Sequence, residues 1–182
     1  MKAAFLDRDG VIIQKAPEDE YIARWEQVQF LPGALEAVST LYRAGFKIFI
    51  VTNQRGVALG KIRLDDLEEI HHRMRATFGE AGVSITGIYF CPHAKDDNCF
   101  CRKPAPGMLL RAAEDHGLEL GRCWVIGDSS SDIEAGLRAG CRTARITPVT
   151  EHAKIEPMPD LIAGDLPSAA EQILCRECAA GA

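Results

Sequence analysis

The chain has 182 residues, a length that predicts one domain over residues 1–182 with a substantial core. Hydrophobic residues make up 47% and charged residues 26%, as in ordinary globular proteins. The formal net charge of −5 disfavours nucleic acid or an anionic membrane surface as the main partner. Lys2 precedes only a few apolar residues before Asp7, too few for a signal peptide or a membrane span. We therefore expect a cytoplasmic protein, and a monomer, because the sequence shows no exposed heptad pattern or long apolar edge.

The first predicted element is a short apolar strand over residues 3–6. It ends in Asp7 and Asp9, two acids that flank an arginine and precede a glycine. Carboxylates at the carboxyl end of a strand lie where open α/β sheets bind their ligands. Residues 11–30 are too irregular for a helix and predict a flap or hairpin over this strand end.

The rest of the chain alternates between predicted helices and strands. Apolar residues at helical spacing, bounded by Pro and Gly, predict helices from residue 32 to 45, 65 to 79 or 82, 106 to 117, 132 to 139 and 167 to 175. Short apolar runs predict strands at residues 48–51, 85–90, 123–126, 143–146 and 160–162. This alternation predicts an α/β fold with a doubly wound, Rossmann-like parallel sheet.

Polar side chains follow these strands and are expected to meet at one edge of the sheet. Asp7 and Asp128, from two different strand ends, make an all-oxygen site suited to Mg²⁺ and substrate phosphate oxygens. Lys103, next to Arg102, supplies the positive charge that a phosphoryl group needs. The hydroxyl of Thr52 can donate to a phosphate oxygen. The edge therefore suits a phosphorylated ligand.

Two aspartates that lie two residues apart can carry out phosphoryl transfer. A first Asp can attack phosphorus to give an aspartyl-phosphate, and a second can protonate the leaving oxygen and then activate water. Asp7 is the predicted nucleophile and Asp9 the predicted acid and base. Such a pair considered alone is as often a turn or a helix cap.

Residues 91–101 predict a metal-binding loop. Its candidate ligands are three thiols and one imidazole: Cys91, His93, Cys99 and Cys101. This set suits a closed, tetrahedral, structural Zn²⁺ site, which would order the loop that delivers Arg102 and Lys103. The chain has seven cysteines, an odd number, and a reducing compartment disfavours disulfides. Four reduced residues without metal are the alternative.

The other cysteines have simpler interpretations. Cys123 and Cys141 are expected to be small buried hydrophobic residues. Cys175 and Cys178 form a Cys-x-x-Cys pair without partner ligands, which we interpret as incidental.

Four motifs in order give the chain a family resemblance. They are Asp7 to Gly10, Thr52 to Gln54, Lys103-Pro104, and Gly127-Asp128 with Asp132. Together they resemble the haloacid dehalogenase (HAD) superfamily of phosphohydrolases. More narrowly, the chain is similar to the heptose bisphosphate phosphatase and histidinol phosphatase group, in which Thr-Asn-Gln, Arg-Lys-Pro and the Cys-x-His…Cys-x-Cys zinc loop occur together. The resemblance covers nearly the whole chain, weakens after about Val149, and implies no large cap domain.

The resemblance implies a role for each motif residue. Asp7 would be the nucleophile and a Mg²⁺ ligand, and Asp9 the acid and base with its backbone carbonyl on the metal. Asp128 would complete the metal site with Asp132 behind it, although Asp132 also suits a plain acid at a helix N-terminus. The residues implied to bind the phosphate or the rest of the substrate are Thr52, Asn53, Gln54, Arg55, Arg102 and Lys103.

Four positions depart from the family pattern, and one of them is Gln14, which replaces a frequent Asn. Arg55 follows the Thr-Asn-Gln motif where relatives carry Ser, and Leu59 stands where a basic residue is common. Ser129 follows Asp128, where many relatives carry Lys or Arg. These changes affect the expected substrate pocket and leave the expected chemistry intact.

The resemblance implies a Mg²⁺-dependent phosphatase that acts on a small sugar phosphate through an aspartyl-phosphate. The implied substrate is the C7 phosphate of D-glycero-D-manno-heptose 1,7-bisphosphate. Histidinol phosphate, or another small phosphomonoester, is the alternative within this class. A zinc-stabilised binding domain without turnover is the alternative from a different class, and the intact Asp7, Asp9, Lys103 and Asp128 argue against it.

Overall fold

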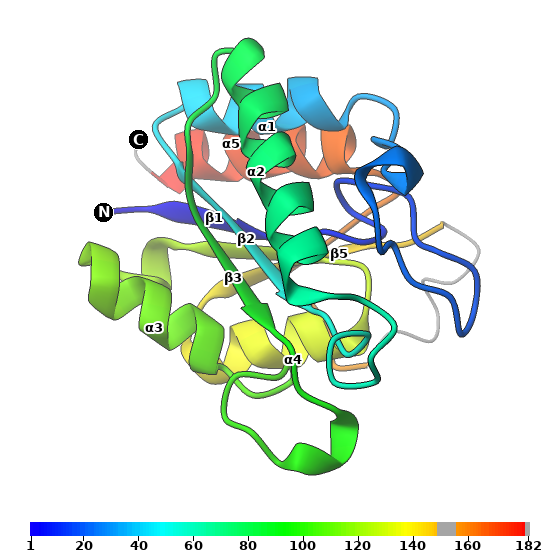
Figure 1. The fold of residues 1–182 in the computed structure, drawn as a ribbon. Coiled ribbons are helices and arrows are strands. Elements are labelled where there is room, and N and C mark those ends of the chain that lie inside the picture. The colour runs from blue at the N-terminus through cyan, green and yellow to red at the C-terminus, as the bar shows by residue number, and fades with distance from the viewer. Residues whose placement is uncertain (149–155, 181–182) are drawn as a thin grey trace.

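A computed structural model describes residues 1–148 and 156–180 (Figure 1). Its strands form a six-stranded parallel sheet in the order β3-β2-β1-β4-β5-β6. The strands are β1 (Ala3–Leu6), β2 (Lys47–Asn53), β3 (Ile85–Cys91), β4 (Trp124–Gly127), β5 (Arg142–Ile146) and β6 (Leu161–Ala163). The helices are α1 (Ala34–Arg43), α2 (Leu64–Glu80), α3 (Gly107–His116), α4 (Ser130–Ala139) and α5 (Leu166–Ala180), with short 3₁₀ turns η1 (Trp25–Gln27), η2 (Lys95–Asp97) and η3 (Leu120–Arg122). The predicted doubly wound α/β fold is confirmed.

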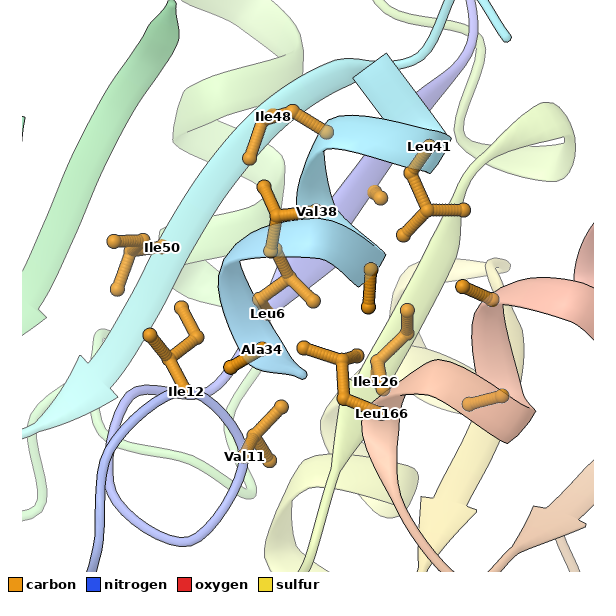
Figure 2. Close-up of a cluster of buried hydrophobic side chains, with 14 of the residues drawn as sticks. Leu6, Val11, Ile12, Ala34, Val38, Leu41, Ile48, Ile50, Ile126 and Leu166 are labelled. Atoms are coloured by element: carbon orange, nitrogen blue, oxygen red, sulfur yellow. The ribbon is translucent and has the colours of Figure 1, made fainter. Parts of the chain in front are cut away.

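Helices cover both faces of the sheet. Figure 1 shows α1, α2 and α5 on one face and α3 and α4 on the other. Successive residues of a strand point to opposite faces, so Ala4 and Leu6 of β1 join the core beneath α1, whereas Phe5 joins the core beneath α3 and α4. In Figure 2, Val38 and Leu41 of α1 lie over this first core. Burial on both sides explains why the strands appear in the sequence as continuous apolar runs.

Most element boundaries lie within two residues of the predicted ones, and the largest difference is at the end of α5. Helix α1 begins after Gly33 and is followed by Gly45, both with positive φ. Helix α5 runs to Ala180 rather than to residue 175 as predicted. The sequence after 175 has no Pro or Gly until Gly181, so nothing there ends the helix.

The segment over residues 11–30 is a loop held at both ends rather than a regular hairpin. Isolated bridges join Ile13 to Asp9 and to Phe30, and Gln14 N donates to Gln29 O at 2.8 Å. Its centre contains only the 3₁₀ turn η1. We call residues 11–30 the flap.

Strand β1 lies at the centre of the sheet, between β2 and β4. The chain winds from β1 to β3 on one side and then returns to β4 on the other side, so strand order reverses between β1 and β4. Ligands of open α/β sheets bind outside the carboxyl ends of strands at such a point. Asp7 follows β1 there, and its N–H donates to Ile126 O of β4 at 2.9 Å.

Among residues 1–148 and 156–180, no helix is both long enough and apolar enough to cross a bilayer.

Candidate active site

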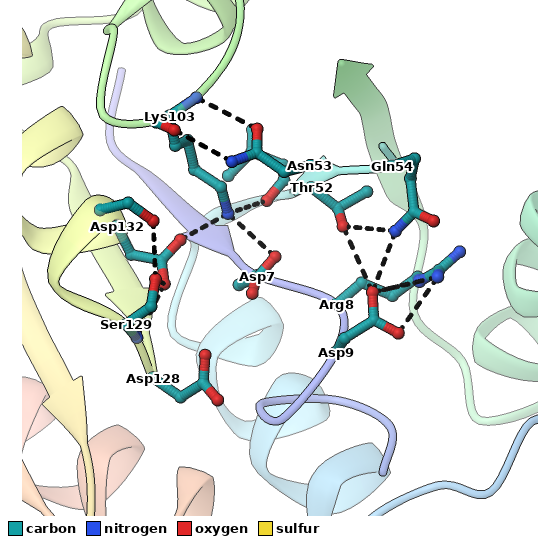
Figure 3. Close-up of polar contacts among 12 residues, drawn as sticks. Asp7, Arg8, Asp9, Thr52, Asn53, Gln54, Lys103, Asp128, Ser129 and Asp132 are labelled. Carbon is teal, nitrogen blue, oxygen red and sulfur yellow. Dashed lines mark hydrogen bonds and ion pairs between the residues drawn. The ribbon is translucent and has the colours of Figure 1, made fainter. Parts of the chain in front are cut away.

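A buried lysine is at the centre of the site. Lys103 Nζ lies 2.9 Å from Asp7 Oδ1 and 2.5 Å from Asp132 Oδ1, and it donates to Val51 O at 2.8 Å (Figure 3). Only 3% of its side chain is exposed. The backbone of Lys103 is held by Asn53, whose Nδ2 donates to Lys103 O at 3.0 Å and whose Oδ1 accepts from Lys103 N at 3.1 Å. Asn53, at the end of β2, therefore fixes the loop that delivers the lysine.

The Lys103 ammonium pairs with two carboxylates, and the pKa values of these two groups shift in opposite directions. Burial alone lowers the pKa of Lys103, but the carboxylates of Asp132 and Asp7 outweigh it and raise that pKa above its ordinary value. Burial opposes ionisation of Asp132 as well, yet Lys103 and Ser129 hold the Asp132 pKa below its usual range. Ser129 donates to Asp132 Oδ2 from its backbone N–H at 3.0 Å.

Within the described residues, Asp7 has no second donor comparable to Ser129, and its side-chain donor is Lys103. Burial raises the pKa of Asp7 to about 7, opposed by Lys103 and reinforced by the carboxylates of Asp132, Asp9 and Asp128. Asp7 is therefore short of compensating positive charge.

Asp128, directly after β4, lies beside a lysine of the flap. Its Oδ2 forms an ion pair with Lys15 Nζ, whereas its buried Oδ1 has no hydrogen-bond partner within the described ranges. Burial raises the Asp128 pKa, and Lys15 opposes this. Gly10 makes the close approach possible: it has φ +90°, and a Cβ there would lie 2.1 Å from Asp128 Oδ2.

These carboxylates fit a divalent cation. Asp7, Asp128 and Asp132 each offer an oxygen within 4.8 Å of the others. A cation would give the orphaned Asp128 Oδ1 a partner and supply the positive charge that Asp7 lacks. Oxygen donors of this kind suit Mg²⁺. Asp132 already holds Lys103, so Asp7 and Asp128 are the better placed protein ligands.

The carboxylate of Asp9 lies apart from this cluster (Figure 3). Arg8 Nε and Nη2 donate to its two oxygens at 3.0 and 3.1 Å, although Arg8 is only 1% exposed. Gln54 Nε2 donates to Asp9 Oδ2 at 3.0 Å and to Thr52 Oγ1 at 2.8 Å. Arg8 and Gln54 therefore fix the orientation of Asp9 at the side of the site.

A cavity of about 210 Å³ joins these groups. It is lined by Asp7, Asp9, Lys15, Thr52, Asn53, Lys103, Asp128, Ser129, Ser131 and Asp132. A second cavity of about 180 Å³ shares Asp9, Lys15 and Asn53 with it and reaches Glu20 and Tyr21 of the flap. We call them the phosphate cavity and the flap cavity.

The four predicted zinc ligands gather after β3. Cys91 Sγ lies 3.5 Å from both Cys99 Sγ and His93 Nδ1, and Cys101 Sγ lies 3.2 Å from His93 Nδ1. A tetrahedral zinc with Zn–S of about 2.3 Å separates its ligand atoms by roughly 3.5–3.8 Å. The cluster therefore has the size of a closed zinc site. Lys103 comes two residues after Cys101, so the cluster fixes the start of the loop that carries Lys103.

Comparison with known proteins gives the family. A family model described as HAD-hydrolase-like matches residues 100–169. The D-glycero-beta-D-manno-heptose-1,7-bisphosphate 7-phosphatase of Pseudomonas putida is 38% identical over 177 residues, which cover 96% of this chain and all of that protein. The chain belongs to the HAD-like hydrolase family. The enzyme of the same name from Helicobacter pylori is 41% identical over 140 residues, or 76% of this HAD-like hydrolase and 79% of the relative.

A solved structure extends the comparison to the fold. D,D-heptose 1,7-bisphosphate phosphatase from B. bronchiseptica, complexed with magnesium and phosphate, matches this HAD-like hydrolase with a TM-score of 0.88 and 33% identity. The match covers 97% of this chain and 99% of the other. The predicted resemblance to HAD phosphohydrolases is confirmed.

The structure brings most predicted site residues of this HAD-like hydrolase together. Asp7, Asp9, Thr52, Asn53, Lys103, Asp128 and Asp132 all line the phosphate cavity. Arg55 instead donates to Tyr21 Oη at 3.0 and 3.3 Å, which ties the flap to the loop after β2. Arg102 Nη1 donates to His93 O at 3.3 Å and lines a neighbouring cavity with Asn53 and Lys103. Their contacts with a substrate remain predictions.

Sequence analysis assigned no side-chain contact to Arg8 or Lys15, which line the flap cavity. It also assigned no role to His71 of α2, which lies near Arg8. His71 is buried, and burial, with Arg8 nearby, lowers its pKa to about 3. A signal was present for His71: it lies four residues after Leu67 and three before Met74, on the apolar stripe of α2. For Arg8 and Lys15, no comparable sequence pattern indicated the partner of the side chain.

Proposed function

We propose that this HAD-like hydrolase is a Mg²⁺-dependent phosphatase in which Asp7 is the nucleophile. The observation that carries this proposal is the arrangement of Asp7 between Lys103 and the Asp128 carboxylate at the floor of the phosphate cavity. Asp7 Oδ would attack phosphorus as the bond from phosphorus to the sugar oxygen breaks, leaving an aspartyl-phosphate. Asp9 would give its proton to the departing oxygen.

Water would complete the reaction. Asp9, now a carboxylate, would take a proton from the water that attacks phosphorus, which releases Asp7 and inorganic phosphate. Bound Mg²⁺ would offset the repulsion between the carboxylates and the anionic substrate. Lys103 and Thr52 line the same cavity, where the ammonium and the Thr52 hydroxyl would hold the phosphate oxygens.

The proposed substrate is the C7 phosphate of D-glycero-β-D-manno-heptose 1,7-bisphosphate. Relatives that span nearly the whole chain have this activity in their names, and the similar crystal structure from B. bronchiseptica contains magnesium and phosphate. Lys15 and Arg102 lie at cavities next to the phosphate cavity, where a second anionic group could be bound.

The test is phosphate release with Mg²⁺ from both anomers of heptose 1,7-bisphosphate, histidinol phosphate and several hexose bisphosphates. We expect the highest kcat/KM on the β anomer. A clear preference for histidinol phosphate would replace the substrate and keep the chemistry. Absence of turnover on every phosphomonoester would favour the binding-domain alternative.

A variant tests the nucleophile. Asp7→Asn removes the attacking charge and should reduce kcat by several orders of magnitude, as loss of a covalent nucleophile does elsewhere. Rapid quenching of the wild-type reaction should trap phosphate on the protein, and Asp7→Asn should trap none. Near-normal turnover in this variant would assign the nucleophile to another residue.

A further inference from the structure

One cation at the phosphate cavity has no role in the chemistry proposed above. Lys15 comes from the flap, and 51% of its side chain is exposed. Its Nζ pairs with Asp128 Oδ2, although the two residues lie far apart in the sequence. Ser129, the uncharged residue that follows Asp128, gives its backbone N–H and its hydroxyl to Asp132. Lys15 therefore brings a positive charge to this rim from another element.

The position of Lys15 joins two cavities. It lines the phosphate cavity with Asp7 and Asp128, and it lines the flap cavity with Asp9 and Tyr21. Asp9 lines both cavities, so a sugar whose leaving oxygen is protonated by Asp9 would extend past Asp9 into the flap cavity. The other cation there, Arg8, is buried and uses its guanidinium on Asp9. Of the two cations that line the flap cavity, Lys15 is therefore the one available to an anionic group on the leaving sugar.

A bound metal would change the partner of Lys15. A divalent cation on Asp128 Oδ1 and the Lys15 ammonium on Oδ2 would place two positive charges at one carboxylate, so each would weaken the binding of the other. The flexible four-carbon stem lets the displaced ammonium turn toward the flap cavity. The transferring phosphate already has Lys103 beside Asp7, so this phosphate does not need Lys15 for charge balance.

We propose that Lys15 binds the second, non-transferring phosphate of the substrate, and that metal binding at Asp128 releases it for this task. The proposal rests on the proposed function and names the residue that distinguishes a bisphosphate from a monophosphate. Lys15 acts as a substrate-binding residue, and it also competes with the metal before the substrate arrives.

The test compares Lys15→Gln with the wild type and with Lys47→Gln, an exposed control where β2 begins. The ratio of kcat/KM on heptose 1,7-bisphosphate to kcat/KM on heptose 7-phosphate should fall at least about tenfold in Lys15→Gln, mainly through KM, for the loss of one charge-assisted contact. Titration calorimetry without substrate should show Mg²⁺ binding more tightly to Lys15→Gln than to the wild type. Lys47→Gln should match the wild type in both measurements.

The outcomes separate two failures. A wild type that does not hydrolyse the bisphosphate would contradict the proposed function. An active wild type whose substrate ratio is unchanged in Lys15→Gln would overturn the assignment of Lys15 to the second phosphate. Unchanged or weaker Mg²⁺ binding in Lys15→Gln would overturn the competition at Asp128.

Discussion

Lys103 shows how a buried charge is retained for function. Its desolvation is unfavourable, and it is compensated by Asp7, Asp132 and the carbonyl of Val51. Each of these groups comes from a different element, so the ammonium is held in one position. A residue held in this way binds a phosphate without a further loss of side-chain freedom.

Removing this charge should destabilise the fold as well as stop the reaction. Lys103→Met leaves Asp7 and Asp132 buried without their cation, and we expect a loss of about 3–5 kcal/mol in the free energy of unfolding. Urea denaturation measures it. Arg102→Gln, the neighbouring and more exposed change, should cost less than about 1 kcal/mol. Equal stabilities for the two variants would contradict this account of Lys103.

Asp7 should give stability a distinctive pH dependence in metal-free protein. Its native pKa is raised to about 7, above the unfolded value of about 3.9, so the native state binds an extra proton between these values. Stability from this group is therefore present at low pH and is lost as pH rises toward 7. Urea denaturation in EDTA should show that Asp7→Asn removes this downward component between pH 4 and 7. An identical slope in the variant would exclude Asp7 as its source.

At the scale of elements, the metal-binding loop is attached to the fold near its two ends. Cys91 ends β3, and Ala58 N donates to Pro92 O at 3.1 Å. Phe100 packs against the start of α3, where a Cβ on Gly107 would lie 2.3 Å from Phe100 O. Between these points the loop has only the 3₁₀ turn η2 and few buried residues. Its order therefore depends on the Cys and His cluster and on any zinc bound there.

Disrupting the cluster should reduce activity through position. Cys101→Ser should lower zinc content, measured by atomic absorption, together with Tm and kcat, because Lys103 follows two residues later. Cys175→Ser, an exposed thiol on α5, is the matched control and should change none of the three. Full zinc content in Cys101→Ser would place the metal elsewhere.

The helices and strands were predictable, and the contacts of the flap were not. Periodicity gave the described helices and strands within a few residues, apart from the end of α5, because each buries a regular face. The flap has no such period. The partner of its Lys15 is Asp128, which follows β4 and is far from Lys15 in the sequence. The burial of Arg8 was missed because it depends on the pairing with Asp9 and on tertiary packing. A local sequence pattern contains neither.

At the scale of the whole molecule, the strand order decides where the chemistry occurs. Parallel strands place Asp7, Asn53 and Asp128 at one edge, as the sequence predicted. A single domain over residues 1–182 and a monomeric state remain predictions.

Mg²⁺ should stabilise the whole molecule as well as activate it. A ligand that binds only the native state adds about 2.7 kcal/mol at a concentration 100 times its Kd, which corresponds to a rise in Tm of about 5–10 °C for a chain of this size. Differential scanning calorimetry with Mg²⁺ or EDTA measures the rise, and EDTA should also stop turnover. Asp128→Asn should show a much smaller rise. Turnover that persists in EDTA would contradict the proposed mechanism.

The central place of β1 has a consequence for how the protein is made. β1 leaves the ribosome before the other strands of the sheet, yet it pairs with β4, whose register joins Leu6 to Ile126. During synthesis one edge of β1 must stay unpaired until β4 emerges, and contacts this distant in sequence form slowly. The nascent chain therefore carries an apolar strand with an open edge until β4 has been made, and Asp7 gains Asp128 as a neighbour only then.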